Sequence, residues 1–265
     1  MQRPATSGLV LVDKPAGPSS FAVVNRLRAR YGVKAGHAGT LDPLATGLLL
    51  VLLGRATRLT RYLVGLDKRY VTEIRLGLRT STGDGEGEVV EETPISSRRE
   101  IEALTGELEL PVPAASAVKI GGERAYRLHR RGVAVEMPTR RSEIHDLRVR
   151  RYAPPLAEVE LHTSSGTYVR SIADALGGHC RTLRRTAVGP FRVEDADEER
   201  VLPPLAALVH VPERQLEEDE AIRIRSGRAV EGAGKGPVAL WVGDGELVAV
   251  GIAKDGVLRP ETVVG

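Results

Sequence analysis

Hydrophobic and polar residues follow two different patterns in the strands that the sequence predicts. The segments 8–13 (GLVLVD) and 48–53 (LLLVLL) are continuous apolar runs of strand length, typical of strands buried on both faces. Segment 68–77 (KRYVTEIRLG) alternates instead, as in a strand with one buried face. The residues that share this face are Tyr70, Thr72, Ile74 and Leu76.

Apolar residues at helical spacing predict a helix that begins at Ser19 or Ser20 and another over residues 166–178. Segments 143–151 and 156–162 predict a hairpin, since each has strand character and a Pro-Pro pair separates them. Paired strands mixed with helices favour an α+β fold for the first 200 residues.

Charged stretches near residues 193–200 and 212–220 are the best candidates for a domain boundary. Beyond them, short strand-like pieces alternate with glycine turns, which predicts a small β-barrel. We therefore predict a domain of residues 1–210 and a second of residues 211–265.

Composition narrows the class of protein. The chain has 265 residues, 42% of them hydrophobic, which suits a large globular core. No apolar run approaches the ~20 residues that span a bilayer, and the N-terminal residues lack a signal-peptide pattern. Cys180 is the single cysteine, so an internal disulfide is impossible. These features predict a cytoplasmic protein without membrane association.

The net charge is only +3, but it is distributed unevenly. Residues 1–70 carry 11 Lys/Arg and 3 Asp/Glu, and residues 119–192 carry 15 and 7, so each segment has a net charge of +8. The intervening and final segments are acidic. Two basic segments can form one surface for a polyanion, or they can be arginines on solvated faces; charge alone leaves both open.

Asp42 is the only ionisable carboxylate in GHAGTLDPLATG, residues 36–47. The residue before a proline favours extended geometry, and the glycines permit turns that a Cβ would forbid. A carboxylate buried alone takes up a proton, whereas one beside an arginine stays ionised. Judged by these residues alone, Asp42 is most simply a turn or cap residue before Pro43.

Familiar cofactor and nucleophile motifs are absent from the sequence. There is no H-E-x-x-H helix, Walker A loop or G-x-S-x-G elbow. The acidic loop TSTGDGEGE, residues 80–88, is interpreted as a solvated turn. We expect no metal, no cofactor and no serine nucleophile. The six histidines are scattered along the chain: His37, His129, His145, His162, His179 and His210.

One long segment and several shorter ones resemble a known family. GHAGTLDPLATGLLLV is similar to the signature of the TruB-type tRNA pseudouridine synthases. The chain also resembles this family, in order, at LVLVDKPAGPSS, DKRYV, SAVKIGGERAYRLHRRG, SSGTYVRSIADALG and TLRRTAVGPF. The resemblance covers residues 8–192, and the C-terminal piece is similar to a reduced PUA domain.

The resemblance implies a pseudouridine-synthase catalytic domain with a central mixed, largely antiparallel sheet, plus a small PUA-like β-barrel. It implies isomerisation of uridine to pseudouridine in the TΨC loop of tRNA, at position 55, by a monomer without cofactor, guide RNA or obligate protein partner. The alternatives are a non-catalytic tRNA chaperone and a guide-RNA-dependent synthase. Residues 116–132 correspond to the family's RNA-gripping insertion, called the thumb.

Catalytic roles also follow from the resemblance. Asp42 would be the essential nucleophile, either attacking the ribose C1′ or abstracting a proton so that a glycal forms. Arg170 would pair with Asp42, and Tyr70 would lie against the uracil and help remove the C5 proton. For Arg170 the alternative is an i,i+4 ion pair with Asp174, and for Tyr70 it is a place in the core.

Further residues would surround the substrate. Tyr168, Leu183 and His37 would line the space around the flipped nucleotide, and Lys14 would brace the active-site loop. Leu183 is equally typical of a core position, and His37 of a backbone cap. The expected phosphate contacts are Lys119, Arg124, Arg127, Arg130 and Arg131.

Two positions depart from the family pattern. Leu110 and Ala115 stand where the family commonly has Gln and Tyr, which affects the expected RNA contacts of that segment and not the chemistry.

Overall fold

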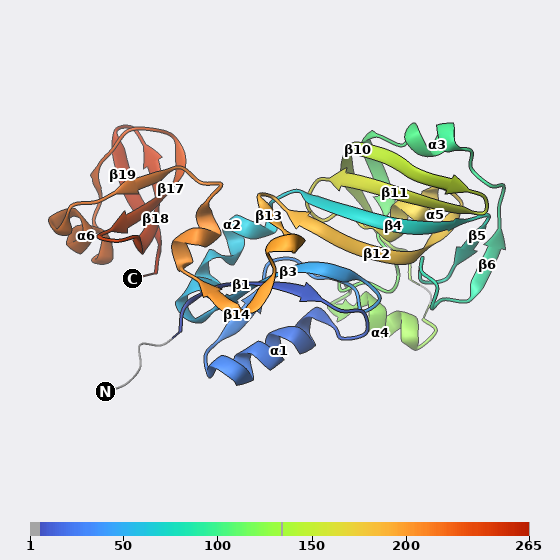
Figure 1. Cartoon of the computed structure of the whole chain (residues 1–265), viewed down its shortest axis with the longest axis horizontal. Helices are drawn as coiled ribbons and strands as arrows, with labels where there is room; N and C mark the ends of the chain where they lie inside the picture. The colour runs from blue at the N-terminus through green and yellow to red at the C-terminus, as the bar shows by residue number, and fades with distance from the viewer. Residues whose placement is uncertain (1–5, 134, 265) are drawn as a thin grey trace. The chain divides into compact units, whose positions relative to one another are not determined.

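The computed structural model, drawn in Figure 1, describes residues 6–133 and 135–264. The contacts between residues divide the chain into two compact units. The first unit comprises Met1–Leu66 and Gly189–Gly265, and the second comprises Asp67–Val188. Among the described residues, no helix has both the length and the apolar character needed to cross a membrane.

Three antiparallel strands carry the core of the first unit. β1 (Gly8–Lys14) lies between β14 (Asp197–Leu202) and β3 (Thr46–Leu53). A short strand, β2 (Ala35–His37), also pairs with β3. Every residue from 48 to 53 is completely buried, which confirms the prediction of a doubly covered strand.

The first helix of this unit begins at the predicted cap. α1 (Ser20–Tyr31) begins after Ser19, whose side chain accepts a hydrogen bond from the backbone N–H of Ala22, and it ends at Gly32 in the left-handed conformation. A 3₁₀ turn, η1 (Gly54–Leu59), and α2 (Thr60–Val64) follow β3.

The second unit is built on an antiparallel sheet of order β12-β4-β11-β10-β7, whose strands are shown in Figure 1. β4 buries alternate residues, as predicted, and β10 and β11 form the predicted hairpin. α5 packs against β12 and β7. The bounds are β7 Gly106–Pro111, β10 Thr139–Ala153, β11 Leu156–Thr163, β4 Lys68–Leu76, β12 Gly178–Val188 and α5 Val169–Ala175.

Smaller elements of the second unit are attached to this sheet. The thumb-like segment forms two short paired strands and a helix, and α3 begins with a capping box. The bounds are β5 Leu78–Thr80, β6 Val89–Glu92, α3 Arg98–Glu102, β8 Lys119–Ile120, β9 Glu123–Arg124 and α4 Ala125–Arg130.

The C-terminal residues form a separate five-stranded sheet of order β15-β17-β18-β19-β16. α6 packs on it, and Leu240, Val248 and Ile224 lie in the shared core. The bounds are β15 Glu213–Gln215, α6 Glu218–Arg225, β16 Val230–Glu231, β17 Gly236–Val242, β18 Glu246–Lys254 and β19 Val257–Val263.

The charged segment near residue 193, a candidate domain boundary, is not an unstructured linker. It contains β13 (Phe191–Arg192), the 3₁₀ turn η2 (Val193–Asp195) and β14, and η3 (Pro204–Leu208) follows. The division at residue 210 stays a prediction, whereas the α+β class with a mixed sheet is confirmed.

Candidate functional site

The loop that carries Asp42 connects β2 to β3 in the first unit and is anchored by its neighbours. The buried hydroxyl of Ser20 accepts a hydrogen bond from the N–H of Leu41 and donates one to the Leu41 carbonyl, both at 2.8 Å. The Asp42 carbonyl accepts from the N–H of Ala45 at 3.1 Å. The backbone of Asp42 therefore takes part in a turn, as its local sequence suggested, while its side chain is half-buried.

Lys14 holds the other side of this loop. Its ammonium is completely buried and donates to the carbonyls of Pro15 at 2.8 Å, Pro18 at 2.9 Å and Pro43 at 3.3 Å. Three acceptors match the three N–H bonds of an ammonium group. Because Pro43 follows Asp42, these contacts fix the chain directly beside the predicted nucleophile.

Tyr70 lies on the buried face of β4 in the second unit, with 7% of its surface exposed. Its partner across the ladder is Arg185 of β12, and Leu183 lies opposite Thr72 on the same strand pair. Residues directly opposite one another share a face of the sheet. Tyr70 and Leu183 therefore belong to one face, as their predicted roles require.

Two buried cations on this face were missed in the sequence. Lys68 and Arg185 are 5% and 1% exposed. The ammonium of Lys68 donates to the hydroxyl of Ser165 at 2.9 Å. Burial, followed by the nearby charge of Arg185, lowers the pKa of Lys68 to about 8. The alternation of segment 68–77 places Lys68 on the buried face, so the sequence did contain a signal for it.

Arg170 of α5 is 2% exposed and is fixed by acceptors from three separate positions. Its guanidinium donates to the carbonyl of Thr82 at 2.6 Å and to that of Ala115 at 3.0 Å, and it lies 3.7 Å from the carboxylate of Asp84. Since the Ala115 contact uses the backbone, it does not depend on the side chain at that position.

Asp84 is an exception to the expectation that the acids of the loop at 80–88 are solvated, whereas Glu86 and Glu88 are exposed as expected. Its carboxylate is 5% exposed and accepts hydrogen bonds from the Thr82 hydroxyl at 2.6 Å and the N–H of Glu86 at 3.1 Å. The loop is tied to β12, because the N–H of Cys180 donates to the Gly83 carbonyl at 3.0 Å. A buried carboxylate requires such partners, and the Arg170 guanidinium is one of them.

The i,i+4 alternative for Arg170 does not describe these contacts. Asp174 lies 3.6 Å from the guanidinium of Arg79, which also donates to the Asp174 carbonyl oxygen at 3.1 Å. A cavity of about 200 Å³ opens beside Arg170, with Gly83, Val112 and Ser171 in its lining. The predicted pairing of Arg170 with Asp42 stays a prediction.

His37 and Tyr168, which were predicted to line the substrate space, lie in different units. His37 ends β2 and pairs with Val51 across the ladder, and Tyr168 is the residue before the first turn of α5. Both are half-buried. Their predicted roles stay predictions.

The predicted phosphate contacts of the thumb-like segment are exposed, but they differ in their partners. Arg127 and Arg130 lie over the ring of Tyr126, at 5.9 and 5.8 Å from its centroid. Arg131 instead donates twice to the carboxylate of Glu123, at 2.9 Å each. Lys119 pairs across the short ladder with Arg124, whose guanidinium donates to the carbonyl of Ala117.

The chain matches a protein-family model and several named relatives. Residues 26–169 match the model described as the TruB family pseudouridylate synthase, N terminal domain. The chain is 42% identical to a tRNA pseudouridine synthase B of Arthrobacter sp. strain FB24, over 97% of this chain and 96% of that protein. It is equally similar to the protein of that name from Thermobifida fusca strain YX, covering 97% and 98%.

Solved structures share the fold at lower sequence identity. A chain of the structure of an H/ACA RNP bound to a substrate RNA containing 2′-deoxyuridine superposes with a TM-score of 0.73 at 22% identity, over 100% of this chain and 88% of that one. A chain of a Cbf5-Nop10-Gar1 complex gives 0.72 at 24% identity, with the same coverage.

Proposed function

The chain belongs to the TruB family of pseudouridylate synthases, and from this membership we propose that it isomerises uridine to pseudouridine in the TΨC loop of tRNA, at position 55. The protein is a pseudouridine synthase and hence an isomerase. The observation that carries the finer proposal is the sequence relationship over nearly the full length to proteins named tRNA pseudouridine synthase B.

The reaction exchanges one glycosidic bond for another. The N1–C1′ bond breaks, the uracil rotates, and a C5–C1′ bond forms, while the proton lost from C5 balances the proton gained at N1. The Asp42 carboxylate serves either as the nucleophile at C1′ or as the base that forms a glycal. Ser20 and Lys14 support this role, since they hold the chain on both sides of Asp42.

Arg170 and Tyr70 complete the proposed chemistry. Arg170 keeps Asp42 ionised and aimed, and the acceptors that fix its guanidinium support such a positioning role. Tyr70 lies against the uracil and assists removal of the C5 proton. His37, Tyr168 and Leu183 line the space for the flipped nucleotide, which Leu183 reaches from the same sheet face as Tyr70.

The substrate uridine has to leave its stacked position before it can react. Extrusion costs a few kcal/mol, which phosphate contacts and contacts to the flipped base offset. The exposed cations of the thumb-like segment are suited to these phosphate contacts. We assign the C-terminal five-stranded sheet a second RNA-binding role, as a reduced PUA-like domain.

A single assay tests the function and both alternatives. The protein alone is incubated with a TΨC stem-loop in EDTA, and pseudouridine is mapped. We expect complete conversion by the unaltered protein and none by Asp42→Asn, with binding of the RNA by the variant within about tenfold. The control Asp195→Asn, at an exposed position in η2 outside the proposed RNA-binding segments, should remain active.

Other outcomes would reject the proposal. Normal conversion by Asp42→Asn would remove Asp42 from the mechanism. RNA refolding without conversion would favour a chaperone, and conversion only after addition of a guide RNA and partner proteins would favour the guide-dependent class.

A further inference from the structure

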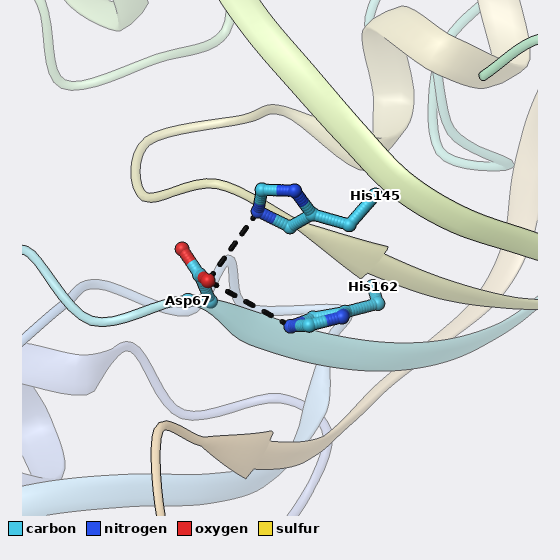
Figure 2. A group of neighbouring side chains, drawn as sticks. All are labelled: Asp67, His145 and His162. Carbon is cyan, nitrogen blue, oxygen red and sulfur yellow. Dashed lines mark ion pairs between the residues drawn. The ribbon is translucent and has the colours of Figure 1, made fainter. Parts of the chain in front are cut away.

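Two histidines and an aspartate meet at one end of the second unit's sheet (Figure 2). His145 comes from β10, His162 from β11, and Asp67 is the residue before β4. The Nε2 atoms of His145 and His162 lie 3.3 and 3.8 Å from the same oxygen, Oδ2 of Asp67. The side chains remain partly open to solvent, since 27% of His145, 26% of His162 and 45% of Asp67 is exposed.

We propose that Asp67, His145 and His162 bind a divalent transition-metal ion of the Zn²⁺ type. Imidazole nitrogen and carboxylate oxygen are donors that Zn²⁺ accepts at about 2.0–2.2 Å. Three protein ligands leave a fourth position for water, and the partial exposure of the side chains lets water reach it. This site lies outside the groups assigned to the isomerisation.

The spacing of the donor atoms fits such an ion. One donor atom from each residue lies within 4.8 Å of the other two. Donors around a tetrahedral Zn²⁺ are about 3.3 Å apart, as the bond length and the tetrahedral angle require. The two nitrogen–oxygen distances are 3.3 and 3.8 Å, so small side-chain rotations would place all three donors around one ion.

A second carboxylate lies beside the histidines. Nδ1 of His145 lies 3.4 Å from the carboxylate of Glu143, the outer-shell arrangement that orients many metal-binding histidines. Glu143 would therefore orient the His145 ring while Nε2 faces the ion.

Such an ion would join three neighbouring chain segments. β11 pairs with β10 on one side and with β4 on the other, and each of the three segments supplies one ligand. Binding to the folded state alone would therefore stabilise the second unit. The proposed role of the ion is to stabilise the fold, and this role is independent of the proposed chemistry at Asp42.

Zn²⁺ titration of the full chain without an affinity tag tests the site. Calorimetry of EDTA-treated, dialysed protein should show one equivalent bound, and Zn²⁺ should raise the melting temperature. Co²⁺ should give a visible absorption band of a four- or five-coordinate site. Mg²⁺ should produce none of these effects, since it prefers oxygen ligands.

Substitutions define which residues bind. His145→Asn, His162→Gln and the more exposed Asp67→Asn should each weaken Zn²⁺ binding at least tenfold, and Glu143→Gln by about tenfold, as for an outer-shell partner. The control His129→Asn, in α4, should bind normally. Circular dichroism verifies that each variant folds. If a histidine variant unfolds, Asp67→Asn remains as the test of the site. Absence of Zn²⁺ binding to the unaltered chain, or unchanged binding after Asp67→Asn and His162→Gln, would overturn the proposal.

Discussion

Two cationic regions of the second unit hold their charge in opposite ways. Arg170 is buried, and its guanidinium is fixed by two carbonyls and the Asp84 carboxylate. The thumb-like segment, residues 116–132, instead exposes its lysine and arginines to solvent. The first arrangement fixes the orientation of one guanidinium group, whereas the second places several exposed charges where a polyanion can reach them.

The difference teaches what each region can do. A buried cation keeps its geometry because removing a partner leaves a desolvated charge behind. Exposed cations are screened beyond about 8 Å at physiological salt, so they act on phosphates that approach closely. We therefore assign positioning to Arg170 and attraction of RNA to the thumb-like segment.

Replacing the buried cation should have the largest effect. Arg170→Met leaves Asp84 buried without its guanidinium partner, and we expect a loss of about 3–5 kcal/mol in the free energy of unfolding. Urea denaturation followed by circular dichroism measures it. Asp84→Asn should cost less, because an amide keeps part of the contacts with Thr82 and Glu86.

The double variant decides whether the pair is coupled. If Arg170 and Asp84 interact as the structure shows, Arg170→Met with Asp84→Asn should cost less than the two single changes added together. If the losses in the free energy of unfolding simply add, the two side chains act independently. Arg170 would then not be held by Asp84, and it would not differ in this respect from the exposed arginines.

Lys68 is a second buried cation of this unit, and its pKa lies in a range where the effect of its titration on stability can be measured. Its pKa is about 8 in the folded chain against the usual 10.5, so the unfolded chain binds more protons between these values. Stability should therefore rise between about pH 8 and pH 10.5, and the unfavourable contribution of about 1–3 kcal/mol should be fully present below pH 8.

Lys68→Met should remove this part of the pH dependence and raise stability at neutral pH. The matched control is Lys254→Met, since Lys254 is exposed and its removal should leave the pH profile unchanged. Melting temperatures from pH 7 to pH 10.5 provide the measurement. Parallel profiles for the Lys68 variant and the unaltered chain would show that the burial of this ammonium carries no such cost.

Much of the fold could be predicted because local patterns specify it. The run at 48–53, the alternation in β4 and the cap at Ser19 each depend on neighbours in the sequence. The contacts that complete the site were harder to predict, since they join residues far apart. The glycine-rich, acidic loop around Asp84 predicts a solvated side chain, whereas its cationic partner lies 86 positions later, on α5.

The histidine cluster shows the same limit. The hairpin of β10 and β11 was predicted, but its register was not. His145 falls where the register shifts, between Ile144 and Asp146, and His162 pairs with Asp146. A bulge changes which side chains meet, so spacing in the sequence gave no indication that these two histidines share one carboxylate.

The smallest expected effect compares two neighbouring arginines of the exposed region. Arg130 lies over the Tyr126 ring, whereas Arg131 already forms two hydrogen bonds with Glu123. A phosphate would have to compete with that carboxylate for Arg131. We expect Arg130→Gln to weaken tRNA binding about threefold and to reduce the magnitude of the slope of log affinity against log salt by about one.

Arg131→Gln should change the affinity for tRNA less than about twofold. Filter binding at several salt concentrations measures both; equal losses for the two variants would mean that the Glu123 pair opens when RNA binds, and that this region is held less firmly than the contacts suggest.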